Sequence, residues 1–308
     1  MKFQVNRELL YSRGEPDDPR LGDVTQTPTV REFEKRDWDI VLIGLPDDRG
    51  IAMNRGRPGA AEGPSAIRKW FYRLVPPATD LRIADLGDLV MTDSLEADHA
   101  AATEATALGL SRAKRVALLG GGHDWAFSPI AALKQAGRTG FINLDAHLDV
   151  RPSAVPHSGT SYWRALEAGV QGEDAVWFGV QKASAAKMHK EYVEAKGGRV
   201  FFGDGSKGSD PEALLREAKS LSGRCDAVDL SLDMDVFAMS EAPGVSAPQP
   251  GGLEARTVLV LLGELLRSER VRTFGIYETS PPNDVMEMTS RLAARCLWEG
   301  CAGLRRTE

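Results

Sequence analysis

Gly140-Phe-Ile-Asn-Leu-Asp-Ala-His-Leu-Asp149 is the stretch of sequence from which the fold follows. Its first half is a short apolar run, which predicts a buried strand. Asp145, His147 and Asp149 then follow at intervals of two, and in an extended segment this spacing sends all three side chains to one face. Because buried carboxylates need partners, the pattern indicates a cation at the end of this strand.

Seven other segments share the short Val, Ile, Leu and Phe runs that are typical of parallel strands covered on both faces. They are residues 39–44, 81–86, 115–119, 175–180, 199–202, 227–232 and 273–277. Helical periodicity is found in residues 99–113, 128–136, 183–195, 211–221, 253–266 and 284–296, and a further helix opens at Pro64. This alternation predicts an α/β fold, a three-layer α/β/α arrangement with a mostly parallel eight-stranded sheet. Without a linker or repeat, residues 1–308 are expected to form a single domain, with the polar residues 1–37 as a surface arm.

The composition excludes several classes of partner. A net charge of −6 argues against nucleic acid or an anionic membrane as the main partner. No apolar run approaches membrane-spanning length. Cys225, Cys296 and Cys301 form no metal motif and no disulfide framework, so a cytoplasmic protein is expected, with Cys296 and Cys301 as core residues.

Four predicted strands are followed by side chains that can bind metal ions or transfer protons. His123 follows one strand and Asp145 another, Asp233 and Asp235 follow a third, and Glu278 follows a fourth. The carboxyl edge of an open parallel sheet is where ligands bind, so these residues are expected to share one crevice. A glycine-rich turn or a DxD pair is weak evidence by itself, but three such motifs in order at strand ends are hard to explain as packing.

The charges of this set require compensation. Four carboxylates on adjacent strand ends cannot all remain ionised unaided, whereas two divalent cations would balance them. The donor set is Asp145, Asp149, Asp233 and Asp235 with the imidazoles of His123 and His147. One imidazole per ion among carboxylates suits Mn²⁺ or Mg²⁺ better than Zn²⁺. His99 and His189 are expected on solvated helix faces and receive no role.

The segments GGGHD (120–124), NLDAHLD (143–149) and SLDMDVFAMSEAPGVSAPQPGG (231–252) resemble the signature segments of the ureohydrolase family, which comprises arginases, agmatinases and formimidoylglutamases. The resemblance extends over about residues 39–278 and implies an arginase-like fold with a homo-oligomeric state. It also implies a cofactor of two Mn²⁺ ions. Carried over by position, one ion would be held by His123, Asp145, Asp149 and Asp233, and the other by Asp145, His147, Asp233 and Asp235.

The resemblance also implies a reaction. Family members attack an amidine-type carbon with a metal-bridging hydroxide and expel an amine. Glu278 matches the glutamate that orients the cationic end of the substrate, and Asp149 is placed to carry the proton to the leaving amine. Ser158 aligns with the proton-shuttling histidine of arginases, with His157 one position away. His157 is open to three interpretations: a proton relay, a substrate contact, or a cap for its own loop.

Further segments resemble formimidoylglutamases more than arginases: residues 54–64, 149–152, 157–160 and 242–248. The substrate of that enzyme, N-formimidoyl-L-glutamate, carries two carboxylates, which call for fixed positive charge. Arg57 and Arg151 are the candidates, with Asn54 and Ser158 as additional substrate contacts. Arg57 is equally open to a role as a loop-ordering salt bridge. The residues after Asp235 and after Glu278 depart from the Asp-Pro and Asn-Pro pairs that are usual elsewhere in the family.

The leading hypothesis is therefore a hydrolase of histidine degradation that converts formimidoylglutamate and water into L-glutamate and formamide. The nearest alternative is an agmatinase or a guanidino-acid hydrolase, which would release urea from another small amidine or guanidino molecule. A metal-binding homologue without catalytic activity is a second alternative. A metallophosphatase is disfavoured because no phosphate-cradling glycine loop with a lysine is visible and because Glu278 would repel phosphate.

Overall fold

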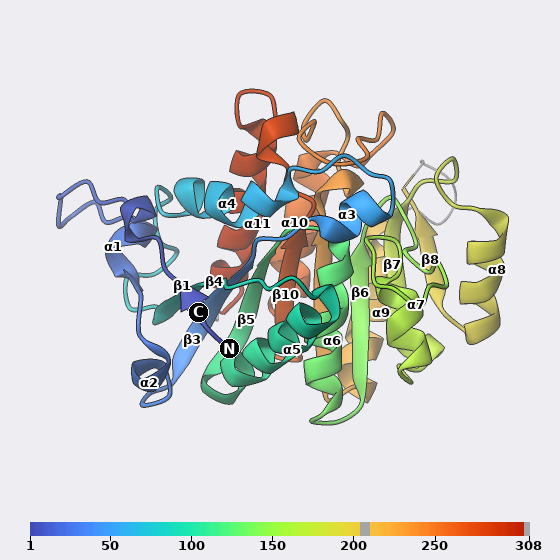
Figure 1. The fold of residues 1–308 in the computed structure, drawn as a ribbon, viewed down its shortest axis with the longest axis horizontal. Helices are drawn as coiled ribbons and strands as arrows, with labels where there is room; N and C mark the ends of the chain where they lie inside the picture. The colour runs from blue at the N-terminus through green and yellow to red at the C-terminus, as the bar shows by residue number, and fades with distance from the viewer. Residues whose placement is uncertain (204–209, 305–308) are drawn as a thin grey trace.

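A computed structural model of the chain describes residues 1–203 and 210–304. One ten-stranded sheet runs through this structure, and helices cover both of its faces (Figure 1). The expected three-layer α/β/α class is confirmed. The single-domain assignment stays a prediction.

The eight predicted strands are all present, and each pairs in parallel with its neighbours among the eight. They are β3 (Trp38–Leu45), β4 (Ile83–Leu89), β5 (Ala113–Gly120), β6 (Thr139–Leu144), β7 (Ala175–Val180), β8 (Arg199–Phe202), β9 (Ala227–Asp233) and β10 (Val271–Tyr277). The order across the sheet is β4-β3-β5-β10-β9-β6-β7-β8. Strands β5, β10, β9 and β6 are therefore neighbours at the centre, although β5 ends at Gly120 and its neighbour β10 begins only at Val271.

The N-terminal residues do more than wrap the surface. β1 (Phe3–Gln4) pairs antiparallel with β4, and β2 (Thr25–Gln26) pairs parallel with the same strand. Strand β4 would otherwise expose its unpaired backbone groups at the edge of the sheet, and the two short strands cover them. Pieces of two residues are too short to show periodicity in a polar sequence, so the sequence predicted eight strands where the sheet has ten.

Two apolar cores lie on opposite faces of the sheet, as Figure 1 shows for the helices. One face is covered by α5 (Leu95–Arg112), α6 (Phe127–Lys134), α7 (Ser161–Glu167) and α8 (Lys187–Lys196). The other is covered by α4 (Gly63–Phe71), α9 (Pro211–Arg224), α10 (Ala255–Leu265) and α11 (Met288–Ala302). Strand side chains alternate between the two cores: Ile40 and Leu42 face one, and Val41 and Ile43 face the other. The short helices α3 (Arg49–Met53) and α7 were not predicted, because five and seven residues make fewer than two turns and show no clear periodicity.

Arg115, at the amino edge of the sheet, is 1% exposed and joins two helices to it. Its guanidinium donates hydrogen bonds to the carbonyls of Leu266 (2.7 Å) and Gly300 (2.8 Å), at the ends of α10 and α11. A third bond reaches the carbonyl of Val271 at 3.1 Å. The last carbonyls of a helix have no intrahelical partner, so Arg115 caps both helices. Burial lowers the pKa of Arg115 to about 10.

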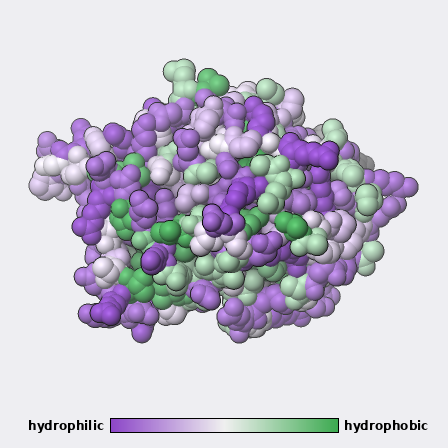
Figure 2. Space-filling model, in the orientation of Figure 1, coloured by the Kyte–Doolittle hydropathy of each residue, from purple (hydrophilic) through white to green (hydrophobic). Residues whose placement is uncertain are grey.

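On the face drawn in Figure 2 the surface is mainly hydrophilic, with apolar residues in small scattered groups. Among the described residues, no helix combines the length and the apolar character that crossing a membrane requires. Cys225, Cys296 and Cys301 are all buried and form no disulfide with a described residue, which confirms the expected core position of Cys296 and Cys301.

Candidate metal centre and substrate cavity

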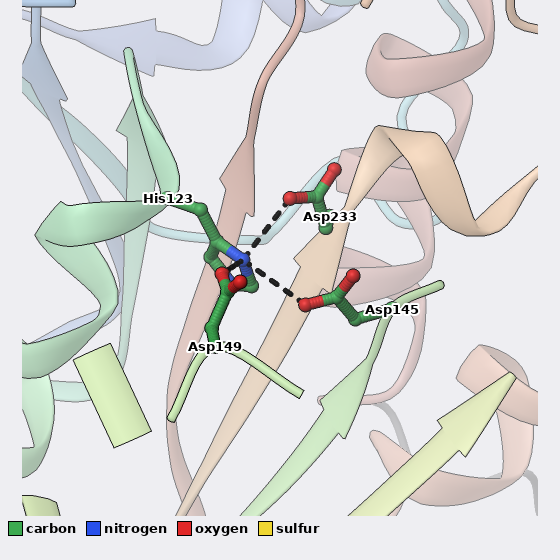
Figure 3. Close-up of side chains that lie close together, drawn as sticks. All are labelled: His123, Asp145, Asp149 and Asp233. Atoms are coloured by element: carbon green, nitrogen blue, oxygen red, sulfur yellow. Dashed lines mark ion pairs between the residues drawn. The ribbon is translucent and has the colours of Figure 1, made fainter. Parts of the chain in front are cut away.

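Three carboxylates converge on the ring of His123, which stands in the 3-10 turn after β5 (Figure 3). Its Nδ1 lies 2.9 Å from an oxygen of Asp149, 3.0 Å from one of Asp233 and 3.2 Å from one of Asp145. The four residues come from the ends of β5, β6 and β9, of which β6 and β9 are neighbours while β10 separates β9 from β5. Their donor atoms lie close enough together to hold one metal ion.

A second donor group lies beside the first. The Nδ1 of His147 is 2.9 Å from Asp235 Oδ2 and 3.5 Å from Asp145 Oδ1. Asp145 thus turns one oxygen to each imidazole and belongs to both groups. The structure therefore brings all six predicted ligands together as two adjoining donor sets. Asp233 belongs only to the first set, and its Oδ1 accepts the backbone N–H of Asp235 at 2.8 Å. The predicted role of Asp233 as a ligand of both ions therefore stays a prediction.

The residues fit a pair of hard dications. His123 Nδ1 is buried and has no hydrogen-bond partner, while its Nε2 lies 2.9 Å from the hydroxyl of Ser231. When Nε2–H donates to Ser231, the Nδ1 lone pair points at three carboxylate oxygens, an arrangement that a metal ion between them would stabilise. Burial, together with Asp145, raises the pKa of Asp149 to about 6. Burial and Asp235 raise the pKa of Asp233 well above its usual value.

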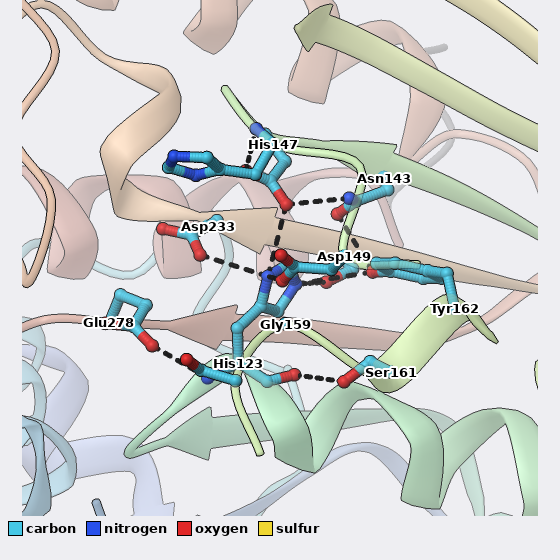
Figure 4. Close-up of polar contacts among 12 residues, drawn as sticks. His123, Asn143, His147, Asp149, Gly159, Ser161, Tyr162, Asp233 and Glu278 are labelled. Atoms are coloured by element: carbon cyan, nitrogen blue, oxygen red, sulfur yellow. Dashed lines mark hydrogen bonds and ion pairs between the residues drawn. The ribbon is translucent and has the colours of Figure 1, made fainter. Parts of the chain in front are cut away.

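Hydrogen bonds from residues outside the donor sets hold the ligands in place (Figure 4). Asn143 donates to Asp145 at 2.9 Å and accepts from the hydroxyl of Tyr162 at 2.9 Å. The hydroxyl of Ser161 donates to the carbonyl of His123 at 2.6 Å. Sequence reasoning assigned no role to these residues. Asn143 had a usable signal, since it precedes Asp145 by the same interval of two that relates the ligands to one another.

The expectation that His99 lies on a solvated helix face is wrong. His99 is 3% exposed, its Nε2 lies 2.9 Å from Asp124 Oδ2, and its ring stacks on Trp125 with centroids 4.2 Å apart. The first turn of α5 is buried against the 3-10 turn that carries His123, and a helical pattern alone cannot show such a contact. His189, also expected in solvent, is half-buried and lines the substrate cavity described below.

Glu278 stands over the donor sets in a left-handed backbone conformation, with φ of 64°. Its Oε1 accepts the backbone N–H of His123 at 2.9 Å, and its buried Oε2 has no hydrogen-bond partner. Burial and the neighbouring Asp233 raise the pKa of Glu278 well above its usual value. A free carboxylate oxygen at this point can receive a cationic N–H group.

A cavity of about 300 Å³ opens above the donor sets. Its lining combines carboxylates, imidazoles and three guanidinium groups. The acidic residues are Asp149, Asp233, Asp235 and Glu278, and the arginines are Arg55, Arg57 and Arg151. The lining therefore carries charge of both signs.

Three of the predicted substrate contacts form a chain along this cavity. Arg151 Nη1 donates to Asn54 Oδ1 at 2.9 Å, and Asn54 Nδ2 donates to the hydroxyl of Ser158 at 2.9 Å. Arg57 is engaged differently, since it donates to the carbonyls of Val245 (2.7 Å) and Ser246 (3.1 Å). These bonds tie two loops together and correspond to the loop-ordering interpretation, with carbonyls in place of the expected acidic partner.

His157 does not belong to the described lining of this cavity. Its Nδ1 accepts the backbone N–H of Gly159 at 3.2 Å, and its carbonyl accepts the hydroxyl of Thr160 at 2.8 Å. These contacts agree with the loop-capping interpretation. A role in proton transfer or substrate binding stays a prediction.

Comparisons with known proteins agree with this geometry. The model of the arginase family matches residues 38–302. The formimidoylglutamase of Halobacterium salinarum is 33% identical over 311 residues, which cover 98% of this chain and 99% of the relative. The formimidoylglutamase of Rhodococcus jostii is 33% identical and covers 83% of each chain. The crystal structure of Trypanosoma cruzi formiminoglutamase with Mn²⁺ superposes with a TM-score of 0.84 at 29% identity, covering 93% of this chain and 98% of that one.

Proposed function

This chain belongs to the arginase family, and we propose that it hydrolyses the amidine C–N bond of N-formimidoyl-L-glutamate to give L-glutamate and formamide. The observation that carries the proposal is the cavity beside the donor sets, whose lining combines carboxylates with three arginines. A substrate that is cationic at its reacting end and carries two carboxylates matches both kinds of side chain. The sequence similarity to formimidoylglutamases supports the same choice.

Two Mn²⁺ ions are the proposed cofactor, held by His123, Asp145, Asp149 and Asp233 and by Asp145, His147 and Asp235. When bound, such a pair supplies a Lewis acid and makes a nucleophile available from water near neutral pH. The carboxylate-rich donor sets favour this metal chemistry over zinc. The T. cruzi formiminoglutamase structure with Mn²⁺ supports the choice of metal.

The side chains of the protein itself orient the substrate and move protons. Glu278 Oε2 accepts an N–H of the amidinium group and sets the direction from which its carbon is attacked. Asp149 lies beside His123 on the cavity lining, where its carboxylate can take up a proton and pass it to the leaving nitrogen. Asn143 and Tyr162 keep Asp145 in position during these steps.

The test is turnover by the manganese-loaded protein. Formimidoylglutamate, agmatine, arginine and 4-guanidinobutyrate are offered separately, and both formamide and urea are measured. The proposal expects formamide from formimidoylglutamate with the highest kcat/KM of the set. A higher kcat/KM for a substrate without the second carboxylate would overturn it.

An agmatinase or guanidino-acid hydrolase is the second candidate. It is supported by a TM-score of 0.78 to the proclavaminate amidino hydrolase of Streptomyces clavuligerus, at 26% identity over 91% of this chain and 98% of that one. Release of urea in the same assay would identify it. Binding of manganese without turnover of any of the four substrates would instead indicate a non-catalytic homologue. The homo-oligomeric state and the cytoplasmic location stay predictions.

A further inference from the structure

The three arginines of the cavity differ in what their side chains touch. Arg57 is held by two backbone carbonyls, and Arg151 is held by the side chain of Asn54. The guanidinium of Arg55 makes no hydrogen bond or ion pair with any residue that the structure describes, although it lines the same cavity. Among the described residues, the guanidinium N–H groups of Arg55 are therefore left free for a ligand.

The backbone at Arg55 is also unusual. Its φ is 63°, in the left-handed region that residues other than glycine seldom adopt. Two of the other four such residues, Asp149 (φ 49°) and Glu278 (φ 64°), line the same cavity. The following Gly56 fits tightly, since a Cβ there would lie 2.4 Å from the hydroxyl oxygen of Ser246. The surrounding loop thus holds Arg55 in a strained conformation, as is common for residues that bind ligands.

We propose that Arg55 is a specificity-determining residue that binds the side-chain carboxylate of the substrate, while Arg57 serves to anchor the loop. This assignment rests on the proposed function. In formimidoylglutamate the α-carboxylate is attached to the carbon that bears the reacting nitrogen, so it stays near Glu278. The side-chain carboxylate lies farther along the molecule and can reach an exposed guanidinium, where the planar fork of N–H groups binds carboxylate in two parallel bonds.

The experiment compares two substrates on two variants. N-formimidoyl-L-glutamine has the shape of the proposed substrate but a neutral side chain. Arg55→Asn removes the charge while keeping a residue that tolerates the left-handed conformation, and Arg55→Lys keeps the charge. We expect Arg55→Asn to raise KM for formimidoylglutamate about 10- to 50-fold with kcat within about threefold. For formimidoylglutamine the change should be below about threefold, and Arg55→Lys should retain most of the preference for glutamate.

The control is Arg267→Asn, an exposed arginine at the opposite edge of the sheet, which should leave both substrates unaffected. An equal loss on both substrates, or no loss on formimidoylglutamate, would overturn the assignment of Arg55. Thermal unfolding of Arg55→Asn should match the wild type, because the substitution breaks no contact with the described residues.

Calorimetry with the products separates this inference from the proposed function. Wild-type protein should bind L-glutamate more tightly than L-glutamine, and Arg55→Asn should abolish the difference. If the wild type does not turn over formimidoylglutamate, the proposed function fails, and the glutamate titration still decides the role of Arg55. Equal affinity of wild type and variant for L-glutamate, or no binding by either at millimolar concentration, would overturn it.

Discussion

The two edges of one sheet both hold buried charge, and they hold it in opposite ways. At the amino edge, Arg115 directs its N–H groups to backbone carbonyls at helix ends. At the carboxyl edge, several carboxylates crowd around His123, and buried atoms of His123 and Glu278 have no hydrogen-bond partner. The first arrangement is complete within the protein, whereas the second is complete only when a cation and a substrate are added.

The contrast separates buried charges that stabilise the fold from buried charges that bind a ligand. A charge with fixed partners, like Arg115, stabilises the fold and is costly to remove. A cluster of like charges with unpartnered atoms destabilises the empty protein and is retained for binding. Substitutions at the two edges should therefore have effects of opposite sign on the stability of the metal-free protein.

The largest effect is expected from Asp233→Asn at the carboxyl edge. The substitution removes a donor oxygen beside His123, so kcat/KM should fall at least about 10³-fold and manganese should bind more weakly. The amide oxygen can still accept the N–H of Asp235, so the metal-free variant should unfold at an equal or higher urea concentration. Asp93→Asn, at an exposed position, is the control. Activity within tenfold of the wild type would contradict the role of this carboxyl-edge cluster in metal binding.

Arg115→Met at the amino edge should have the opposite effect on stability. The carbonyls of Leu266, Gly300 and Val271 lose their buried donor, and the free energy of unfolding should fall by about 3 kcal/mol. Urea unfolding measures the loss, and kcat should remain near the wild-type value because the site lies at the other edge. Arg267→Met should change stability by less than about 0.5 kcal/mol. A loss of similar size in both variants would contradict the capping role.

Removal of the metal should make stability depend on pH. Burial and neighbouring carboxylates raise the pKa of Asp149 to about 6 and raise those of Asp233 and Glu278, so the folded protein binds more protons than the unfolded chain. The free energy of unfolding should therefore fall by roughly 2 kcal/mol as pH rises from 4 to 7. Asp145 titrates below this window, since its two imidazole neighbours outweigh burial and lower its pKa.

Urea unfolding at several pH values, with and without Mn²⁺, measures this dependence. Manganese should remove most of the decline by neutralising the carboxylates. Parallel pH profiles for the two forms would show that the cluster is not the source of the effect.

A further effect is expected at Asp229, on β9 behind the donor sets. Burial raises its pKa to about 7, its Oδ1 accepts the hydroxyl of Thr273 at 2.6 Å, and its Oδ2 has no hydrogen-bond partner. Asp229→Asn should raise the free energy of unfolding by about 1 to 2 kcal/mol at pH 5, where the carboxyl group is protonated in the folded protein but ionised in the unfolded chain. At pH 8 the gain should be roughly 2 kcal/mol larger, because the folded protein then also has to hold the charge or take up the proton. The same change at both pH values would show that charge is not the cause.

Local patterns in the sequence were enough to predict the eight central strands and the residues at their ends. Each strand is a contiguous apolar run, and the ligands Asp145, His147 and Asp149 repeat with the period of extended backbone. The rule that ligands bind at the carboxyl edge then placed His123, Asp233 and Glu278 with them. The charge of four carboxylates indicated two dications, and the resemblance to the ureohydrolases supplied their identity as Mn²⁺ and the ligands of each.

What the sequence did not determine depends on contacts between residues far apart in the chain. Three examples are the pairing of β1 and β2 with β4, the burial of His99 against Asp124, and the bonds of Arg57 that join two loops. In each case the local sequence pattern of one segment does not indicate which other segment it contacts. Arg55 and Arg57 are two residues apart and chemically identical. Only the tertiary structure decides that one is held by carbonyls and the other left free, because a side chain's partners are set by the packing of distant loops.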